Sequence, residues 1–123
     1  MDKTDSILIW DIETDTHGGK PNPKTDTLKV FGCYSYLSKK YYCLTDHDQI
    51  RKVIQAHKFL VGFNTKQYDT VVMNNNGFDD LISECGQFGD CTFNYKINID
   101  MFEIVKKRAG AMKVKKGMLG DLL

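Results

Sequence analysis

The stretch ILIWDIETD, residues 7–15, constrains the fold of this chain more than any other segment. Residues 6–12 predict a strand with apolar side chains on both faces, a pattern typical of a central strand that is covered on both sides. Two acids, Asp11 and Glu13, nevertheless occur at its end. Because removing an ionised carboxylate from water is very costly unless the group is paired or bound to a metal, these acids point to a specific partner.

Side chains alternate along a strand, so Asp11 and Glu13 project to the same face, roughly 7 Å apart at their bases. Two carboxylates at this spacing favour a hard divalent cation such as Mg²⁺ or Mn²⁺, which prefers oxygen ligands. Open α/β sheets also place ligands at the carboxyl ends of their strands. The alternative interpretation is that the strand ends at Trp10 and that both acids are solvated.

The remaining pattern predicts an α/β fold in which a mixed sheet is flanked by helices. Three strands come first and pair as antiparallel neighbours, and the later strands alternate with helices, as in a parallel arrangement. A polar loop with two Pro and two Gly residues separates the first two strands, at 14–27. Residues 78–96 receive no assignment. The predicted elements are strands at 6–12, 28–37 and 39–44, a helix at 45–57, a strand at 59–63, a helix at 67–77, a strand at 97–99 and a helix at 101–109.

Three helix boundaries carry sequence signals. Thr45 and Asp48 form a predicted capping box for the first helix, and Gly77 is a plausible end for the second. Asp100 precedes the third helix as a predicted N-cap, with Glu103 three residues further on. The alternative for Asp100 is a metal ligand, because it follows a strand.

Composition indicates a single soluble domain over residues 1–123, with 41% hydrophobic and 27% charged residues. The net charge of +1 gives no global attraction to nucleic acid, so any basic partner surface has to be local. Neither an export signal nor an apolar run of about 18 residues is present, and we expect a cytoplasmic protein without membrane contact. We expect reduced thiols, with a zinc site as a less favoured alternative, for Cys33, Cys43, Cys85 and Cys91.

A third acid, Asp69, follows the predicted strand 59–63 in the first turn of the next helix, where a carboxylate also complements the helix dipole. The order D-x-E-T and then apolar-Gly-Phe-Asn-x4-Asp resembles the first two motifs of the DEDD superfamily of 3′→5′ exonucleases, which have the ribonuclease H-like fold. The resemblance is closest to proofreading domains of bacteriophage and viral DNA polymerases, and it covers residues 7–123.

The resemblance implies roles for particular residues. Asp11, Glu13 and Asp69 match the acids that hold two Mg²⁺ or Mn²⁺ ions and carry out catalysis in the family. Thr14 follows the D-x-E as it usually does there, and Phe63 and Asn64 match a stretch used near the terminal nucleotide. One departure is visible, because many members have three residues between this Asn and the Asp, and this chain has four.

Further substrate contacts would come from aromatic and basic side chains. Phe63, Tyr68 and Phe102 are candidates for stacking on a frayed base, although core packing is the commoner role for such residues. The segment 105–117 contains six basic residues and no acid, which suits a phosphate backbone but also a solvated helix face. These basic residues are Lys106, Lys107, Arg108, Lys113, Lys115 and Lys116.

The family also requires a fourth acid on a late helix, in the pattern Y-x3-D or H-x4-D, and neither pattern occurs here; Asp121 fails at both offsets. We therefore expect the C-terminal helix to be missing from a truncated, split or degenerate domain. The predicted function is a metal-dependent 3′–5′ exonuclease domain that acts on single-stranded DNA or the 3′ end of a primer strand, in association with a DNA polymerase domain or subunit. The alternative is a catalytically incomplete nucleic-acid-binding or polymerase-docking domain of the same fold.

Overall fold

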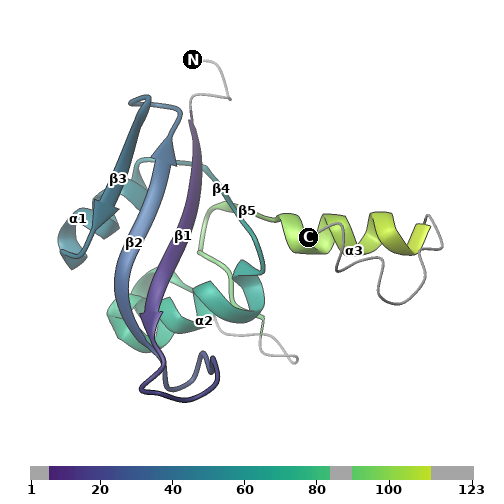
Figure 1. The fold of residues 1–123 in the computed structure, drawn as a ribbon. Helices are drawn as coiled ribbons and strands as arrows, with labels where there is room; N and C mark the ends of the chain where they lie inside the picture. Colours follow the sequence, from purple (N-terminus) through teal and green to yellow (C-terminus); the bar gives the residue numbers. More distant parts are fainter. Residues whose placement is uncertain (1–5, 84–89, 112–123) are drawn as a thin grey trace.

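The computed structural model describes residues 6–83 and 90–111, and it contains a mixed sheet with the strand order β3-β2-β1-β4-β5 (Figure 1). The pairs β1–β2 and β2–β3 are antiparallel, whereas β1–β4 and β4–β5 are parallel. This topology confirms the predicted α/β fold, with three antiparallel strands followed by parallel ones. The strands are β1 (Ile7–Asp15), β2 (Thr27–Ser35), β3 (Lys40–Leu44), β4 (Phe59–Gly62) and β5 (Ile97–Asp100).

The strand β1 continues through both acids to Asp15. The alternative that the strand ends at Trp10 is therefore wrong, and Asp11 and Glu13 are both strand residues. Ladder hydrogen bonds to β2 keep this part extended, since Asp11 lies opposite Gly32 and Glu13 opposite Val30. The backbone thus presents two carboxylates on one face of the sheet.

Helices connect the strands at the predicted places. The connection after β4 is a helical segment that begins with a π-helical turn and is interrupted by a kink at Asn76 and Gly77. Its second π-helical turn contains Gly77 at φ +96°, a left-handed conformation that suits glycine. The helical elements are α1 (His47–Gln55), the first π-turn (Thr65–Asp69), α2 (Thr70–Met73), the second π-turn (Asn74–Phe78), a 3₁₀ turn (Asp79–Leu81) and α3 (Met101–Ala111).

Two sequence predictions about local structure need correction or completion. The N-cap of α1 is Asp46 rather than Thr45, because the Asp46 Oδ1 atom accepts a hydrogen bond from the Gln49 N–H at 3.0 Å. Within the unassigned segment 78–96, the described part forms the 3₁₀ turn and an isolated antiparallel bridge between Ile82 and Phe93. Both residues of that bridge are buried in the hydrophobic core.

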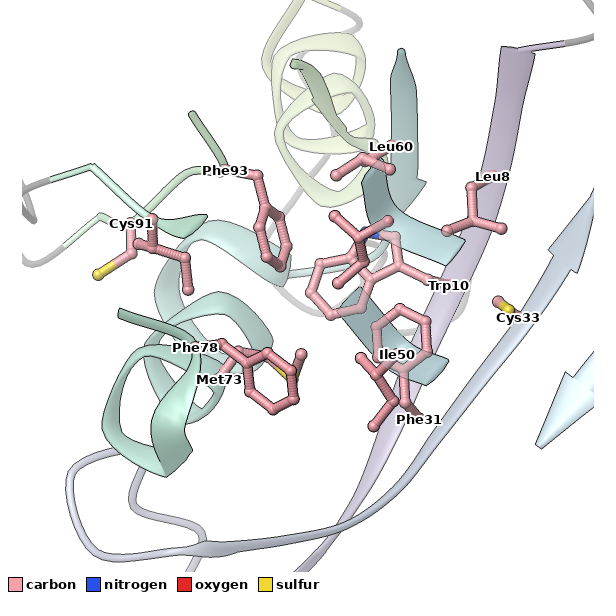
Figure 2. Packing of buried hydrophobic residues seen from close by; sticks show 12 residues of the cluster. Leu8, Trp10, Phe31, Cys33, Ile50, Leu60, Met73, Phe78, Cys91 and Phe93 are labelled. Atoms are coloured by element: carbon pink, nitrogen blue, oxygen red, sulfur yellow. The ribbon is translucent and has the colours of Figure 1, made fainter. Parts of the chain in front are cut away.

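The hydrophobic core lies on one face of the sheet (Figure 2). Trp10 of β1 stacks on Phe31 of β2 with ring centroids 5.4 Å apart, and it meets the edge of Phe93 at 5.4 Å. Helical residues such as Ile50 and Met73 cover these rings and are almost fully buried. Each such side chain contributes about 1.5–3 kcal/mol through burial. This layer holds β1 firmly against the helices.

The opposite face of the sheet is open among the described residues. Ile9, between Leu8 and Trp10 on β1, is 42% exposed, and Tyr41 on β3 is 83% exposed. The helix α3 extends beyond β5, away from the rest of the sheet (Figure 1). The expectation of a strand covered on both sides is therefore met on one side only within residues 6–83 and 90–111. Asp11 and Glu13 lie on this open face.

The cysteines do not all behave as predicted. Cys33 and Cys43 are free thiols, and burial raises the pKa of Cys33 to about 11. Cys91, however, takes part in a disulfide, so the prediction of reduced thiols is wrong for this residue. Cys85 lies outside the described residues. None of the helices that the structure describes is long and apolar enough to cross a membrane.

Candidate acidic site at the ends of the parallel strands

Asp11 and Glu13 occupy the exposed face of β1 next to an irregularity in the sheet. The register with β2 shifts between Glu13 and Thr14, which lie opposite Val30 and Leu28, so β2 carries one extra residue there. Such bulges bend a strand and occur frequently beside functional sites. The Asp11 Oδ1 atom accepts a hydrogen bond from the Ile12 N–H at 2.9 Å, which orients this carboxylate.

The chain leaves β4 in a tight turn over Gly62, Phe63 and Asn64. A side chain at Gly62 would collide with the methyl group of Thr65, and its Cβ would lie 3.1 Å from the carbonyl oxygen of Trp10. Asn64 then adopts a left-handed conformation with φ 56°, which Asn tolerates better than most residues. These residue types therefore allow the loop after β4 to approach β1 closely.

The first π-turn accommodates the four residues between Asn64 and Asp69, one more than many members of the exonuclease family that the sequence resembles have at this place. The Thr70 N–H donates to the Thr65 carbonyl, five residues earlier, rather than four as in an α-helix. A π-turn accommodates one more residue than an α-helical turn and is frequent at functional sites. The four residues between Asn64 and Asp69 are absorbed in this turn, and Asp69 at its end reaches β1.

Asp69 is the central group of the site. Asp69 is only 5% exposed, and its Oδ2 atom is buried without a hydrogen-bond partner. Burial, then the Asp11 carboxyl within hydrogen-bonding reach, and then the charge of Asp100 raise the pKa of Asp69 to about 8. Two carboxyls this close need a proton or a cation between them. Asp11 and Asp69, distant in sequence, thus lie close enough for their carboxyls to interact, and we call them the acidic pair.

Asp100 is the third acid at this edge, and its carboxylate is already engaged. The Oδ1 atom accepts from the N–H groups of Asn64 at 2.7 Å and Phe102 at 3.0 Å, and Oδ2 accepts from the Lys66 N–H at 3.3 Å. The bond from Phe102 confirms the predicted N-cap of α3. The bonds from Asn64 and Lys66 were not foreseen, because nothing in the local sequence shows that β4 and β5 end side by side.

Glu13 does not join the acidic pair in this conformation. Its side chain is exposed two residues beyond Asp11 on the same strand face. Across the described ranges 6–83 and 90–111, no group of three or more His, Cys, Asp or Glu side chains is arranged to hold a metal ion. The structure therefore brings together Asp11 and Asp69 of the three predicted acids, with Glu13 adjacent.

Of the three aromatic residues predicted to stack on a base, Phe63 is exposed, whereas Tyr68 and Phe102 are partly buried. Phe63 is 46% exposed and meets the edge of Phe102 with centroids 5.1 Å apart. The Lys106 ammonium lies 5.1 Å above the Phe102 ring. A surface hollow of about 660 Å³ next to Asp11 is lined in part by Phe63 and Met101. Its volume lies within the range of about 300–1,000 Å³ that is typical of ligand sites.

Thr14 and Tyr68, two predicted substrate contacts, point to the other side of β1. The Tyr68 hydroxyl donates to the Asp26 Oδ2 atom at 2.6 Å and lies 2.9 Å from the Thr14 Oγ1 atom. Burial, followed by the hydrogen bond to Asp26, raises the pKa of Tyr68. Asp26 is 3% exposed and was not singled out from the sequence. The other predicted contacts, Lys113, Lys115 and Lys116, lie outside the described residues.

Fold and site together define a class: a mixed five-stranded α/β sheet of the ribonuclease H-like type, with acids gathered where its parallel strands end. Among solved structures, the chain is similar to the family B DNA polymerase from the hyperthermophilic archaeon Pyrobaculum calidifontis, with a TM-score of 0.62 and 14% sequence identity. The match covers 82% of this chain and 16% of the polymerase. At this identity the similarity shows the fold. No protein-family model and no curated protein sequence matches the chain.

Proposed function

We propose that this chain is a metal-dependent 3′–5′ exonuclease domain of the proofreading type, which hydrolyses phosphodiester bonds at 3′ ends of DNA. The observation that carries the proposal is the proximity of Asp11 to Asp69, with the Asp69 Oδ2 atom buried and without a hydrogen-bond partner. The sequence resemblance to proofreading domains supports it, and so does the shared fold with a DNA polymerase.

The donor set of the acidic pair fits a hard divalent cation. Asp11 and Asp69 offer carboxylate oxygens, and a cation would balance charges that otherwise require a proton. Glu13, on the same face of β1, is the proposed third ligand. Two bound Mg²⁺ or Mn²⁺ ions supply an activated water and stabilise the leaving 3′ oxygen in nucleases of this kind.

The chain's own groups would orient the DNA strand. Phe63 and Asn64 lie at the turn after β4, and Phe63 lines the hollow beside Asp11, where a terminal nucleotide can stack on its exposed ring. The exposed basic side chains of α3, Lys106, Lys107 and Arg108, would neutralise phosphates. Lys113, Lys115 and Lys116 are proposed to extend that contact. Thr14 and Tyr68 would stabilise the first π-turn from the other side of β1, through the hydrogen bonds of the Tyr68 hydroxyl with Thr14 and Asp26.

Thermal unfolding with Mn²⁺ and digestion of 3′-labelled single-stranded DNA test this function together. We expect Mn²⁺ to raise the Tm of the full chain and 5′-mononucleotides to be released from the 3′ end. Both effects should disappear in Asp11→Ala and Asp69→Asn, because each removes one carboxylate of the pair. Asp15→Asn is the matched control, since Asp15 is an exposed acid on the same strand. Equal Mn²⁺ stabilisation in all four proteins would contradict the proposal.

The second candidate is a non-catalytic domain of the same fold that binds nucleic acid or docks a polymerase. It is favoured by one observation: over the part of the chain that the structure describes, no three ligand-type side chains are arranged around a common point. Binding of labelled single-stranded DNA that is retained in Asp11→Ala, together with an absence of hydrolysis in the wild type, would select this function over the exonuclease.

A further inference from the structure

We infer that Asp100 is a positioning residue for the acidic site: its carboxylate holds the turn from which Asp69 is presented, and it does not act as a metal ligand. Its relevance to catalysis rests on the proposed function. The hydrogen bonds that carry the inference, from the N–H groups of Asn64, Lys66 and Phe102, are independent of that function.

The sheet brings Asp100 to the turn. In the parallel pair β4–β5, Asp100 lies in register with Gly62, so both strands end at the same edge. The chain turns sharply directly after Gly62, and the Asp100 side chain meets it there. Because Asp100 is 3% exposed, its carboxylate has little access to water and depends on protein donors.

The turn itself offers those donors. Asn64 is left-handed, at φ 56°, and the helical residues of the first π-turn follow it. Successive N–H groups around such a left-handed residue converge and form a concavity that attracts an anion. The Asp100 carboxylate fills this concavity, with the Asn64 N–H at 2.7 Å. An ion pair between Lys66 Nζ and Glu103 Oε2, at 3.1 Å, ties the same two segments a second time.

This tie bears directly on Asp69. The first π-turn starts at Thr65, immediately after the residue that Asp100 holds, and ends at Asp69. Asp69 is also close enough to Asp100 to be affected by its charge. Functional groups have to be held within about 0.5 Å of a productive geometry, which neighbouring hydrogen bonds normally ensure. Loss of the Asp100 tie therefore moves Asp69 relative to Asp11.

The engagement of the carboxylate also argues against a ligand role. Oδ1 accepts two N–H groups and Oδ2 accepts one. Three of about four lone-pair sites of this carboxylate are therefore occupied, and an ion bound at Oδ1 would displace an N–H group at a cost of about 1–3 kcal/mol. The geometry thus assigns Asp100 to the loop and to the N-terminus of α3.

Two substitutions at Asp100 and one control test the inference in the full chain. Asp100→Asn keeps an oxygen for the Asn64 and Phe102 N–H groups but removes the charge, whereas Asp100→Ala removes every acceptor. Asp46→Ala is the matched control, because Asp46 caps α1 through the Gln49 N–H, far along the chain from the acidic pair. Amide hydrogen exchange at Asn64 and Lys66 reports the tie, and Mn²⁺ titration by thermal shift reports the site.

In Asp100→Ala we expect loss of exchange protection at Asn64 and Lys66 and a Mn²⁺ Kd weaker by about tenfold or more, as for other groups that orient metal ligands. In Asp100→Asn, protection at Asn64 remains and the Mn²⁺ Kd stays within about threefold of wild type. Asp46→Ala lowers the Tm without changing either readout. If Asp100→Ala does not fold, the exchange protection of Asn64 and the Mn²⁺ Kd of Asp100→Asn test the inference on their own.

Three outcomes would overturn the inference. One is unchanged Asn64 protection in Asp100→Ala, which would show that the tie is not needed. The second is an unchanged Mn²⁺ Kd in that variant despite lost protection. The third is a tenfold weaker Kd in Asp100→Asn with Asn64 still protected, which would identify Asp100 as a ligand. Failure of the proposed function is distinguishable, because the wild type itself would then show no response to Mn²⁺.

Discussion

At the residue scale, Asp69 shows how tertiary contacts change the chemistry of one side chain. In the sequence it is an acid in the first turn of a helix, where a negative charge is favourable. In the structure, burial and the neighbouring carboxyls of Asp11 and Asp100 raise its pKa to about 8. The helix dipole is therefore outweighed by desolvation and by like charges, and the protonated form is favoured at neutral pH.

This raised pKa predicts a pH-dependent gain of stability in Asp69→Asn. Because the folded state retains a proton that the unfolded state releases near pH 4, the wild type loses stability as the pH rises from about 4 to about 8. Without divalent ions, Asp69→Asn should match the wild type near pH 4 and exceed it at pH 8 by at most about 5 kcal/mol, because the pKa shift spans about four units. Urea unfolding at several pH values, with EDTA present, measures this. A constant difference across the range would contradict it.

At the element scale, side-chain amides and hydroxyls attach the loop between β1 and β2 to the helical segment. Asn76 donates through Nδ2 to the Asp26 carbonyl at 3.0 Å, and its Oδ1 atom accepts from the Leu28 N–H at 3.1 Å. The Tyr68 hydroxyl donates to the Asp26 carboxylate from the first π-turn. The loop that the sequence predicts between the first two strands is thus held at its end by partly buried polar contacts.

Removal of the Tyr68 hydroxyl should loosen this attachment. In Tyr68→Phe the buried Asp26 Oδ2 atom retains only the Asn22 N–H, at 2.9 Å. We expect a loss of about 1–3 kcal/mol in the free energy of unfolding, with faster amide exchange over residues 16–26. Tyr36→Phe is the control, since Tyr36 is 41% exposed, and it should change stability by less than about 0.5 kcal/mol. Equal effects of both substitutions would contradict the anchoring role.

At the scale of the whole molecule, the two faces of the sheet differ. The face that carries Leu8, Trp10 and Phe31 is covered by helices, as Figure 2 shows. The other face carries Ile9, 42% exposed, and Tyr41, 83% exposed, and it also presents Asp11. Stability therefore comes mainly from one layer of packing, while the candidate site opens onto the other face.

This asymmetry predicts unequal costs for truncating an aromatic ring on each face. Phe31→Ala, at a fully buried position, should lower the free energy of unfolding by about 3–5 kcal/mol. Tyr41→Ser, which loses a contact with Tyr34 at 4.6 Å but little burial, should cost less than about 1 kcal/mol. Denaturant unfolding of both variants gives the comparison. A cost for Tyr41→Ser close to that of Phe31→Ala would show that the second face is also packed.

Much of the element order is predictable from local patterns. An abundance of β-branched and aromatic residues on either side of Ser38 indicates the hairpin of β2 and β3, and the helical spacing of Ile50, Val53 and Ile54 indicates α1. These signals arise within a few neighbouring residues, so they survive in a single sequence. The same holds for the N-cap at Asp100, where an acid stands directly before its helix.

By itself, then, the sequence determined the strand and helix periodicities and the spacing of the acids Asp11, Glu13 and Asp69. Only the tertiary structure decided that Asp69 lies close to Asp11, that Asp100 holds the turn at Asn64, and that Tyr68 joins Thr14 to Asp26. The physical reason is that periodicity is a property of neighbouring residues, whereas these contacts depend on which strand ends meet. Burial and charge at those meeting points then set the role of each side chain.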